Sequence, residues 1–242
     1  KMKVDMRHPY AGKLVFTAFS GSHQDAINKG EQAMMDRNAT IWEVPYLPID
    51  PADIGRKYEP VVRINSQSGK GGIAFVMSTM FGYKLPKAMQ REFADVIQKI
   101  SEEEGGEVAP ERIMDAFREE YLNVKEPYEF LRLKVEDDQQ QDETRVELTF
   151  KYKGEEICAE SVGRGPVDAV KQAIAQSVGT LDITILDYDE HALSKGSHAK
   201  AAAYIHMRDD RTGKETYGVG VSGNITRASI RGVFSALNRL AR

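Results

Sequence analysis

The chain has 242 residues, of which 41% are hydrophobic and 29% charged, and its formal net charge is −4. This length suits one large domain or two to three small ones, and the interspersed charges exclude a basic face for nucleic acid. No apolar run approaches the roughly 18 to 20 residues of a membrane span. The N-terminal residues lack the apolar core of a secretory signal, and the single cysteine, Cys158, excludes an internal disulfide framework. We therefore expect a cytoplasmic protein of several parts.

The first sixty residues are rich in turn signals. Residues 14–19 predict a short strand, and a short amphipathic helix should follow, because Ser22 and Asp25 have the spacing of a capping box. Residues 44–60 contain four prolines, a pattern typical of an ordered loop rather than of a regular element.

The middle of the chain alternates between flexible and helical patterns. Residues 65–72 predict a glycine-rich hinge, since they lack the Gly-Lys-Ser/Thr order of a phosphate-binding loop. Apolar residues at helical spacing predict one helix between Pro86 and Gly105 and a second that opens at Pro110. The stretch 136–143 has no apolar residue, which indicates a loop or a domain boundary.

The last hundred residues contain an internal duplication. Residues 154–176 align with residues 213–235 at a constant offset, and each copy predicts a strand, a turn of small residues and a helix. The two turns are Gly163-Arg164-Gly165-Pro166 and Ser222-Gly223-Asn224-Ile225. Further strands are predicted at 182–186 and 201–207. Two β-rich units with one helix each cannot bury their sheets separately, so we expect them to pack as one α+β domain.

Two residues of the first part are candidates for chemistry. If Ser22 caps its helix, His23 is the first helical residue, where the helix dipole disfavours an imidazolium by about 0.3 to 1 kcal/mol. The neutral ring could then relay a proton; the alternative is that His23 only helps to cap the helix. Tyr46 lies on the proline-rich loop, which could hold its hydroxyl in position or use the ring for packing alone.

No metal site or hydrolase motif is evident. His191, His198 and His206 do not have the spacing of zinc ligands, and neither a nucleophile elbow nor an HExxH motif is present. We expect no metal to bind to this chain.

The duplicated turns are the better candidate for a ligand site. A strand that enters a glycine-rich turn before a helix presents free backbone N–H groups to a carboxylate, and small residues let the ligand approach closely. The apolar wall of such a site could come from Ile185, Tyr188, Ala192, Ala199 and Ile225. The alternative is that Gly163 and Gly165 only satisfy a tight turn.

Several long blocks, in order along the whole chain, strongly resemble the 2-isopropylmalate synthase family. They are Arg7-His8-Pro9-Tyr10-Ala11-Gly12, Phe16-Thr17-Ala18-Phe19-Ser20-Gly21-Ser22-His23-Gln24-Asp25-Ala26-Ile27, Val44-Pro45-Tyr46-Leu47-Pro48-Ile49-Asp50-Pro51, Asn65-Ser66-Gln67-Ser68-Gly69-Lys70-Gly71-Gly72 and residues 228–242. The resemblance implies the α+β C-terminal part of such an enzyme, without its catalytic TIM barrel. The implied parts are linker subdomain I (1–60), a hinge (61–72), the helical linker subdomain II (73–126), a polar linker (127–143) and the regulatory domain (144–242).

The resemblance also implies a function. Members of the family are acyltransferases that condense acetyl-CoA with the 2-oxo acid 3-methyl-2-oxobutanoate in leucine biosynthesis. They act as homodimers with a divalent metal, zinc or magnesium, in the barrel that this chain lacks. His23 and Tyr46 match the family's His and Tyr that complete the partner subunit's active site, so the chain alone is expected to be inactive.

Feedback inhibition by leucine is the second implied property. The positions that match the family's leucine pocket are Gly163, Gly165, Val167, Ile185, Tyr188, Ala192, Ala199 and Ile225. Two alternatives remain open. One is the same region of a citramalate synthase that senses isoleucine; the other is a stand-alone amino-acid-binding module.

Overall fold

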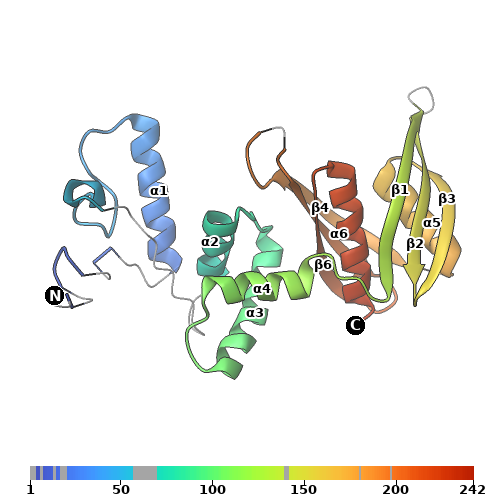
Figure 1. Cartoon of the computed structure of the whole chain (residues 1–242), viewed down its shortest axis with the longest axis horizontal. Helices are drawn as coiled ribbons and strands as arrows, with labels where there is room; N and C mark the ends of the chain where they lie inside the picture. The colour runs from blue at the N-terminus through green and yellow to red at the C-terminus, as the bar shows by residue number, and fades with distance from the viewer. Residues whose placement is uncertain are drawn as a thin grey trace. The chain divides into compact units, whose positions relative to one another are not determined.

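A computed structural model of the chain (Figure 1) describes residues 4–5, 8–12, 15–16, 21–56, 70–138, 142–179, 181–196 and 198–242. The chain divides into two compact units, Lys1–Ala116 and Phe117–Arg242. Within the described ranges, no helix combines the length and the apolar character that crossing a membrane would need.

The described part of the first unit is helical. Its elements are α1 (Gly21–Arg37), the 3-10 helix η1 (Pro51–Ile54), α2 (Lys70–Phe81), α3 (Lys87–Glu104) and the start of α4 (Pro110–Tyr121). The two helices expected after Pro86 and at Pro110 are confirmed. Helix α3 ends at Gly105, whose left-handed backbone (φ 71°) lets its N–H bond to the Ser101 carbonyl.

Two expectations for the first unit need correction. Helix α2 begins at Lys70, inside the segment 65–72 that was expected to be a flexible hinge, because Ile73, Val76 and Met77 bury one face of that helix. Helix α1 begins at Gly21, so His23 lies within its first turn instead of opening it. Of the strand expected at 14–19, only Val15 and Phe16 are described, and they lie in a turn; most of the hinge lies outside the described residues.

The described part of the second unit contains two three-stranded antiparallel sheets, ordered β1-β2-β3 and β4-β5-β6. The elements are β1 (Tyr128–Asp138), β2 (Glu143–Tyr152), β3 (Glu155–Gly163), α5 (Pro166–Val178), β4 (Ile183–Ala192), β5 (Ala201–Asp209), β6 (Glu215–Ser222) and α6 (Ile225–Leu240). The expected α+β fold and its internal duplication are therefore confirmed. Each copy has three strands and then a helix, and the first strand of each carries a register shift, at Phe130/Arg132 and at Ile185/Asp187.

The segment 127–143 is not the polar linker that the resemblance implied. Residues Tyr128–Asp138 form strand β1, which pairs with β2 from Tyr128↔Tyr152 to Asp138↔Glu143. Of the charged stretch 136–143, residues 136–138 belong to β1 and Glu143 begins β2, so they are parts of a hairpin and not a domain boundary. Its composition was misleading because one face of the strand is solvated, and only the partner strand shows which face is buried.

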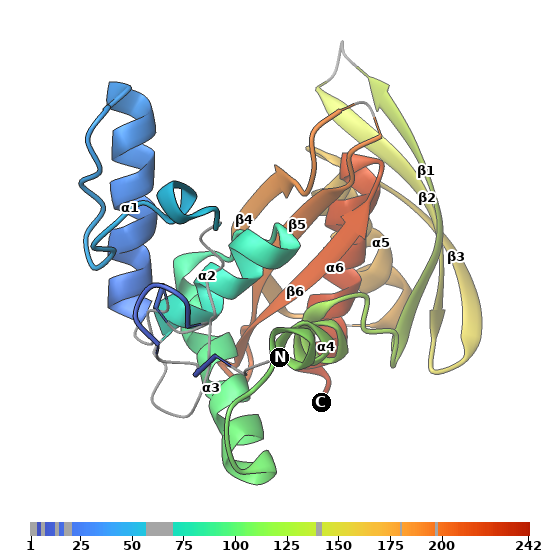
Figure 2. The same cartoon turned by 60° about the vertical axis from the view of Figure 1, so that its left-hand side comes forward.

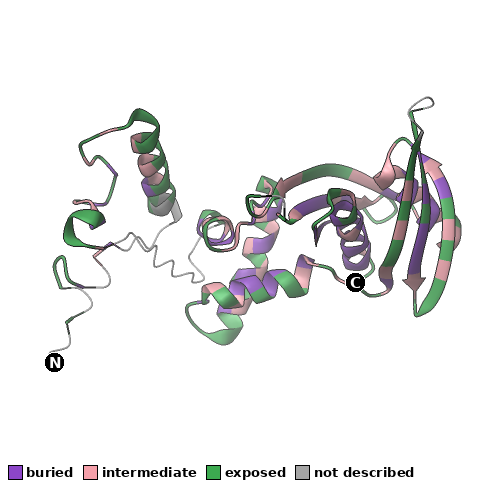
Figure 3. Ribbon diagram, turned by 45° about the horizontal axis from the view of Figure 1, so that its top comes forward, coloured by how far each residue is buried: buried purple, intermediate pink, exposed green. Residues whose placement is uncertain are grey.

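Helix α6 is the centre of the second unit. It packs on β5 and β6 and also contacts β1, and Figure 2 shows it between the two sheets. Nearly every residue from Ala228 to Arg239 is buried, as the purple colour in Figure 3 shows. On one side Phe234 contacts Phe130 and Phe150 of the first sheet, with ring centroids 5.6 and 5.8 Å apart.

On the other side, glycines allow α6 to lie directly on β6. A Cβ atom at Gly218 would overlap the backbone of Gly232 and Ala236, and one at Gly220 would overlap the backbone of Ala228 and Gly232. The backbones of the helix and the strand are therefore in direct contact at these positions.

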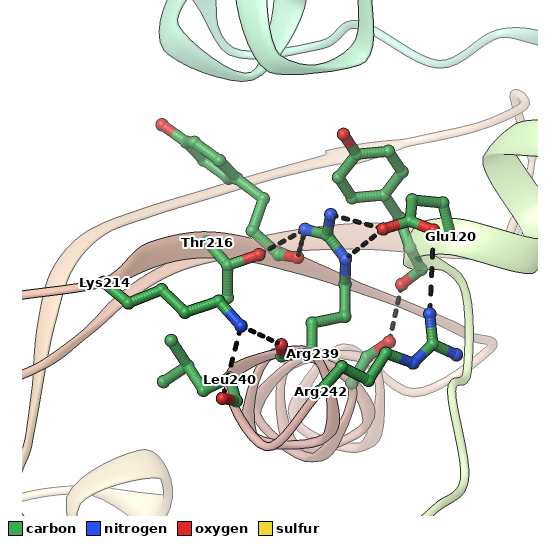
Figure 4. A network of polar contacts seen from close by, with 9 residues as sticks. Glu120, Lys214, Thr216, Arg239, Leu240 and Arg242 are labelled. Carbon is green, nitrogen blue, oxygen red and sulfur yellow. Dashed lines mark hydrogen bonds and ion pairs between the residues drawn. The ribbon is translucent and has the colours of Figure 1, made fainter. Parts of the chain in front are cut away.

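Polar side chains of α6 hold the segment that leads into the sheets. Ser235 Oγ donates to the Tyr121 carbonyl (2.6 Å), and Asn238 bonds to both the N–H and the carbonyl of Tyr128 (2.7 Å each). Arg239, which is 9% exposed, donates to Glu120 (2.7 Å) and to the Tyr217 carbonyl (2.7 Å) (Figure 4). The end of α4 is thus tied to α6 by a buried, charge-assisted network.

We predict that Gly220→Ala destabilises the second unit strongly, because the added methyl group would overlap helix backbone, which cannot move away as a flexible side chain could. Overpacking of this kind costs about 1 to 3 kcal/mol or more. The matched control is Gly223→Ala, where the Cβ meets open space among the described residues and the change should stay within about 0.5 kcal/mol. Urea unfolding monitored by circular dichroism measures both; equal midpoints for the two variants would contradict the packing described here.

Candidate functional site

The first candidate site is the pair His23 and Tyr46, which the structure brings together. His23 is exposed in the first turn of α1, and Tyr46, 61% exposed, lies on the loop that follows this helix. Their ring centroids are 4.1 Å apart with an interplanar angle of 31°. The sequence named both residues but gave no reason for them to touch.

The backbone at Tyr46 has an unusual conformation that explains the contact. The Val44 carbonyl accepts the Leu47 N–H (3.4 Å) across a turn in which Pro45 is followed by Tyr46 at φ 64°. Proline in the second position and a positive φ in the third are typical of a type II turn, whose third residue is usually glycine or asparagine. A tyrosine there costs on the order of 1 kcal/mol, and such strain is found mainly at functional sites.

The turn is fixed to α1 by a small apolar core. Val44 and Leu47, each 4% exposed, pack with the fully buried Ile27 of α1 in a small core. The Trp42 indole N–H donates to the Leu47 carbonyl (2.9 Å). The exposed pair therefore stands on a rigid base, as a site that acts on a molecule from outside this unit requires.

The pair can exchange protons but does not form a metal centre. An imidazole accepts and donates protons, and a phenol donates or accepts a hydrogen bond. In the described residues, no three His, Cys, Asp or Glu side chains are grouped so that they could hold a metal ion. The divalent metal that the resemblance implies is expected in the catalytic barrel and not at this pair.

The second candidate site lies in the second unit, around β4 and the start of α6. Tyr188, 43% exposed, hydrogen-bonds through its hydroxyl to Ser229 Oγ (2.9 Å) and to Glu190. Ser229 in turn donates to the carbonyl of Ile225 (2.9 Å). Burial, and then the hydrogen bond to Glu190, raise the pKa of Tyr188 to about 12, so this phenol stays protonated near neutral pH. Ser229 is a partner that the sequence alone did not single out for this site.

The two duplicated turns differ in how their helices begin. In α6 the Asn224 side chain accepts the Arg227 N–H (2.9 Å) as an N-cap. In α5 the N-cap is Gly165, and the described residues supply no side-chain cap; Pro166, next in sequence, has no N–H. The N-terminus of α5 therefore has no side-chain cap among the described residues, and Asp168 in its first turn accepts the Arg164 N–H (3.2 Å).

Gly163 and Gly165 have different roles in the α5 turn. A Cβ at Gly163 would lie 2.6 Å from the Ala169 nitrogen and 2.8 Å from Asp168 Oδ2, so close packing requires glycine there. Gly165 has an extended backbone (φ 176°) that any residue adopts, and within the described part of the chain its Cβ would meet nothing within 4 Å. Tight packing explains Gly163, whereas Gly165 leaves open space before the helix.

The remaining candidates are spread along the same unit. Val167 and Ile185 are half-buried against its core. Ala192 ends β4, and Ala199 lies in the following connection, where its N–H bonds to the Gly196 carbonyl (3.1 Å). Leu186, Tyr188 and Ile225 are 37%, 43% and 49% exposed, and the Tyr188–Ser229 hydrogen bond joins β4 to the start of α6.

Known proteins match both units. Residues 13–78 match the alpha-isopropylmalate synthase post-catalytic domain, and residues 107–241 match the LeuA allosteric (dimerisation) domain. The 2-isopropylmalate synthase of Clostridium acetobutylicum is 49% identical over 99% of this chain and 43% of that protein. Those of Mycobacterium leprae and Rhodospirillum rubrum are 48% and 46% identical over 99% and 100% of the chain, covering 40% and 43% of their own lengths.

The chain belongs to the 2-isopropylmalate synthase family. The resemblance seen in the sequence is thereby confirmed, and the chain spans less than half the length of the three relatives it is compared with. The duplicated second unit lies within the segment that matches the allosteric dimerisation domain, and the His23–Tyr46 pair lies in the segment that matches the post-catalytic domain.

Proposed function

We propose that this chain completes the active site of a 2-isopropylmalate synthase and carries its leucine-responsive regulatory domain. The full enzyme would condense acetyl-CoA with 3-methyl-2-oxobutanoate. The observation that carries the proposal is the pairing of His23 and Tyr46 on a rigid, exposed turn of the segment that matches the post-catalytic domain. Because this chain covers 40–43% of the relatives' lengths, we assign the zinc or magnesium ion to the catalytic barrel of the full enzyme, and the chain by itself would be inactive.

His23 and Tyr46 would act on a substrate held by the barrel of a partner subunit. The acetyl methyl group must lose a proton, and the thioester must later meet an activated water. An exposed imidazole with a phenol stacked on it can assist either proton transfer once a substrate is brought against it. Their exposure in the isolated chain suits a site that a second subunit closes.

Leucine would bind in the second unit between two copies of the chain. Its carboxylate suits the open N-terminus of α5 at Gly165, and its branched tail suits the exposed surface of Ile185, Ala192, Ala199 and Ile225. The ammonium group could meet Asp187 or a backbone carbonyl. A second copy would cover the apolar surface that one chain leaves exposed, consistent with the match to a dimerisation domain.

The alternatives are less well supported. Citramalate synthase and a stand-alone amino-acid-binding module would share the second unit. However, the relatives compared above are all 2-isopropylmalate synthases, and a pure sensor has no use for the strained turn at Tyr46.

For the active-site role, we predict that His23→Ala or Tyr46→Phe in the full-length enzyme lowers kcat by roughly 10²- to 10⁴-fold, the usual range of general acid–base catalysis. The control is His198→Ala, an exposed histidine of the second unit that should leave kcat unchanged. Steady-state kinetics measure the effect. Normal rates in both first-unit variants would show that the two residues are structural.

For the regulatory role, we predict that Gly165→Asn abolishes leucine inhibition and leaves basal activity intact. The variant gives α5 the same cap that Asn224 gives α6, so a side-chain amide would occupy the N–H groups proposed for the leucine carboxylate. The extended backbone and the open space at Gly165 allow the substitution without strain.

The assay compares kcat with and without leucine in the wild-type enzyme and in this variant. The coupling between two such sites is typically about 1 to 3 kcal/mol, or roughly 5- to 150-fold in affinity. Undiminished inhibition in Gly165→Asn would place the effector elsewhere.

A further inference from the structure

Three positions on one face of α1 support the turn that carries Tyr46. His23, Ile27 and Gly30 have the i, i+4, i+7 spacing that places side chains on a single helix face. His23 contacts the Tyr46 ring, and Ile27 is buried in the core that also contains Val44 and Leu47. Gly30, at the far end of this face, lies against the turn itself.

The contact at Gly30 has no room for a side chain. A Cβ built on Gly30 would lie 2.6 Å from Cδ of Pro45, the residue that precedes Tyr46, whereas its other neighbours, the Cα and Cγ1 of Val44, lie at an ordinary 3.4 Å. Glycine is a poor helix former, and here it occupies the middle of a 17-residue helix. The close approach of the Pro45 ring accounts for its presence.

The position of the Tyr46 ring follows from this contact. The Pro45 ring fixes φ at the second position of the turn, and Tyr46 at φ 64° then directs its side chain toward His23. If the turn were lifted from α1 at Gly30, the Tyr46 ring would move away from His23, because the same helix face carries both contacts.

We infer that Gly30 and Pro45 are positioning residues that set the separation between the His23 and Tyr46 rings. Neither needs to touch substrate. The catalytic consequence of the inference rests on the proposed function, but its geometric content can be tested on this chain alone.

The geometric test uses NMR of the chain with ¹³C-labelled histidine. The Tyr46 ring current shifts the His23 ring protons, whose signal is assigned by its loss in His23→Ala. Gly30→Ala should abolish most of this shift. The matched control, Gly71→Ala on the exposed side of α2, meets open space in the described structure and should leave the His23 signal unchanged.

A double variant tests whether the Pro45 ring is the group that leaves no room for a side chain at Gly30. Pro45→Ala removes Cδ; since this residue is exposed, the variant should fold, with a partly reduced shift because the turn is less restricted. Gly30→Ala/Pro45→Ala should match Pro45→Ala alone, since the overlapping atom is gone. An unchanged signal in Gly30→Ala, or effects of the two changes that simply add, would overturn the inference. If Gly30→Ala does not fold, the match between the double variant and Pro45→Ala remains decisive.

The catalytic test repeats the set in the full-length enzyme. Gly30→Ala should lower kcat roughly 10- to 100-fold with KM nearly unchanged, as expected for a displaced catalytic group. The double variant should recover to the level of Pro45→Ala. If the NMR results hold and kcat is normal in every variant, the positioning is supported and the proposed catalytic role of His23 and Tyr46 is the part that fails.

Discussion

The backbone contact between helix α6 and strand β6 is the constraint on which the second unit depends. Side chains at Gly218 and Gly220 would overlap the helix backbone, so α6 can sink onto the sheet until it is buried on all sides. From that position Phe234 reaches the first sheet, while Ser235, Asn238 and Arg239 hold residues 120–128. The start of the same helix presents Ser229 to Tyr188. Helix α6 thus takes part in the packing of the core, in the contacts with the segment after α4 and in the candidate ligand site.

Duplication supplies two similar helix starts that differ in capping and in burial. Asn224 closes the N-terminus of α6 with its own side chain, whereas Gly165 leaves that of α5 without one in the described residues. The two helices also differ in burial: α6 is enclosed along most of its length, whereas α5 buries one face. A single supersecondary unit, used twice, therefore provides one helix buried in the core and one with an uncapped N-terminus, which we propose as the site of the leucine carboxylate.

Elements with a strong local signal were predictable from the sequence. Helices α3 and α4 follow from proline and glycine boundaries with apolar spacing, and β3–α5 and β6–α6 follow from the duplicated pattern. The sequence pattern did not reveal strand β1, which is rich in charged residues, or helix α2, which begins with two glycines after Lys70. Both elements are stabilised by burial against partners distant in sequence.

The candidate sites show the same limit at the level of single residues. Gly163 and Gly165 look alike in the sequence, yet one is required by packing against Ala169 and the other faces open space. The contact of His23 with Tyr46 depends on a left-handed tyrosine and on Gly30, and neither has a local signature. Contacts of this kind join residues that are distant in sequence, so they are seen only once the packing of the loop on helix α1 is known.

Calorimetric titration of this chain with leucine, isoleucine and valine tests the central claim most directly. The account predicts saturable binding of leucine that is tighter than binding of either other amino acid, because we propose the second unit as the leucine-responsive domain of a 2-isopropylmalate synthase. Tighter binding of isoleucine would indicate a citramalate synthase. The absence of binding by all three amino acids would contradict the assignment of this unit as the leucine sensor.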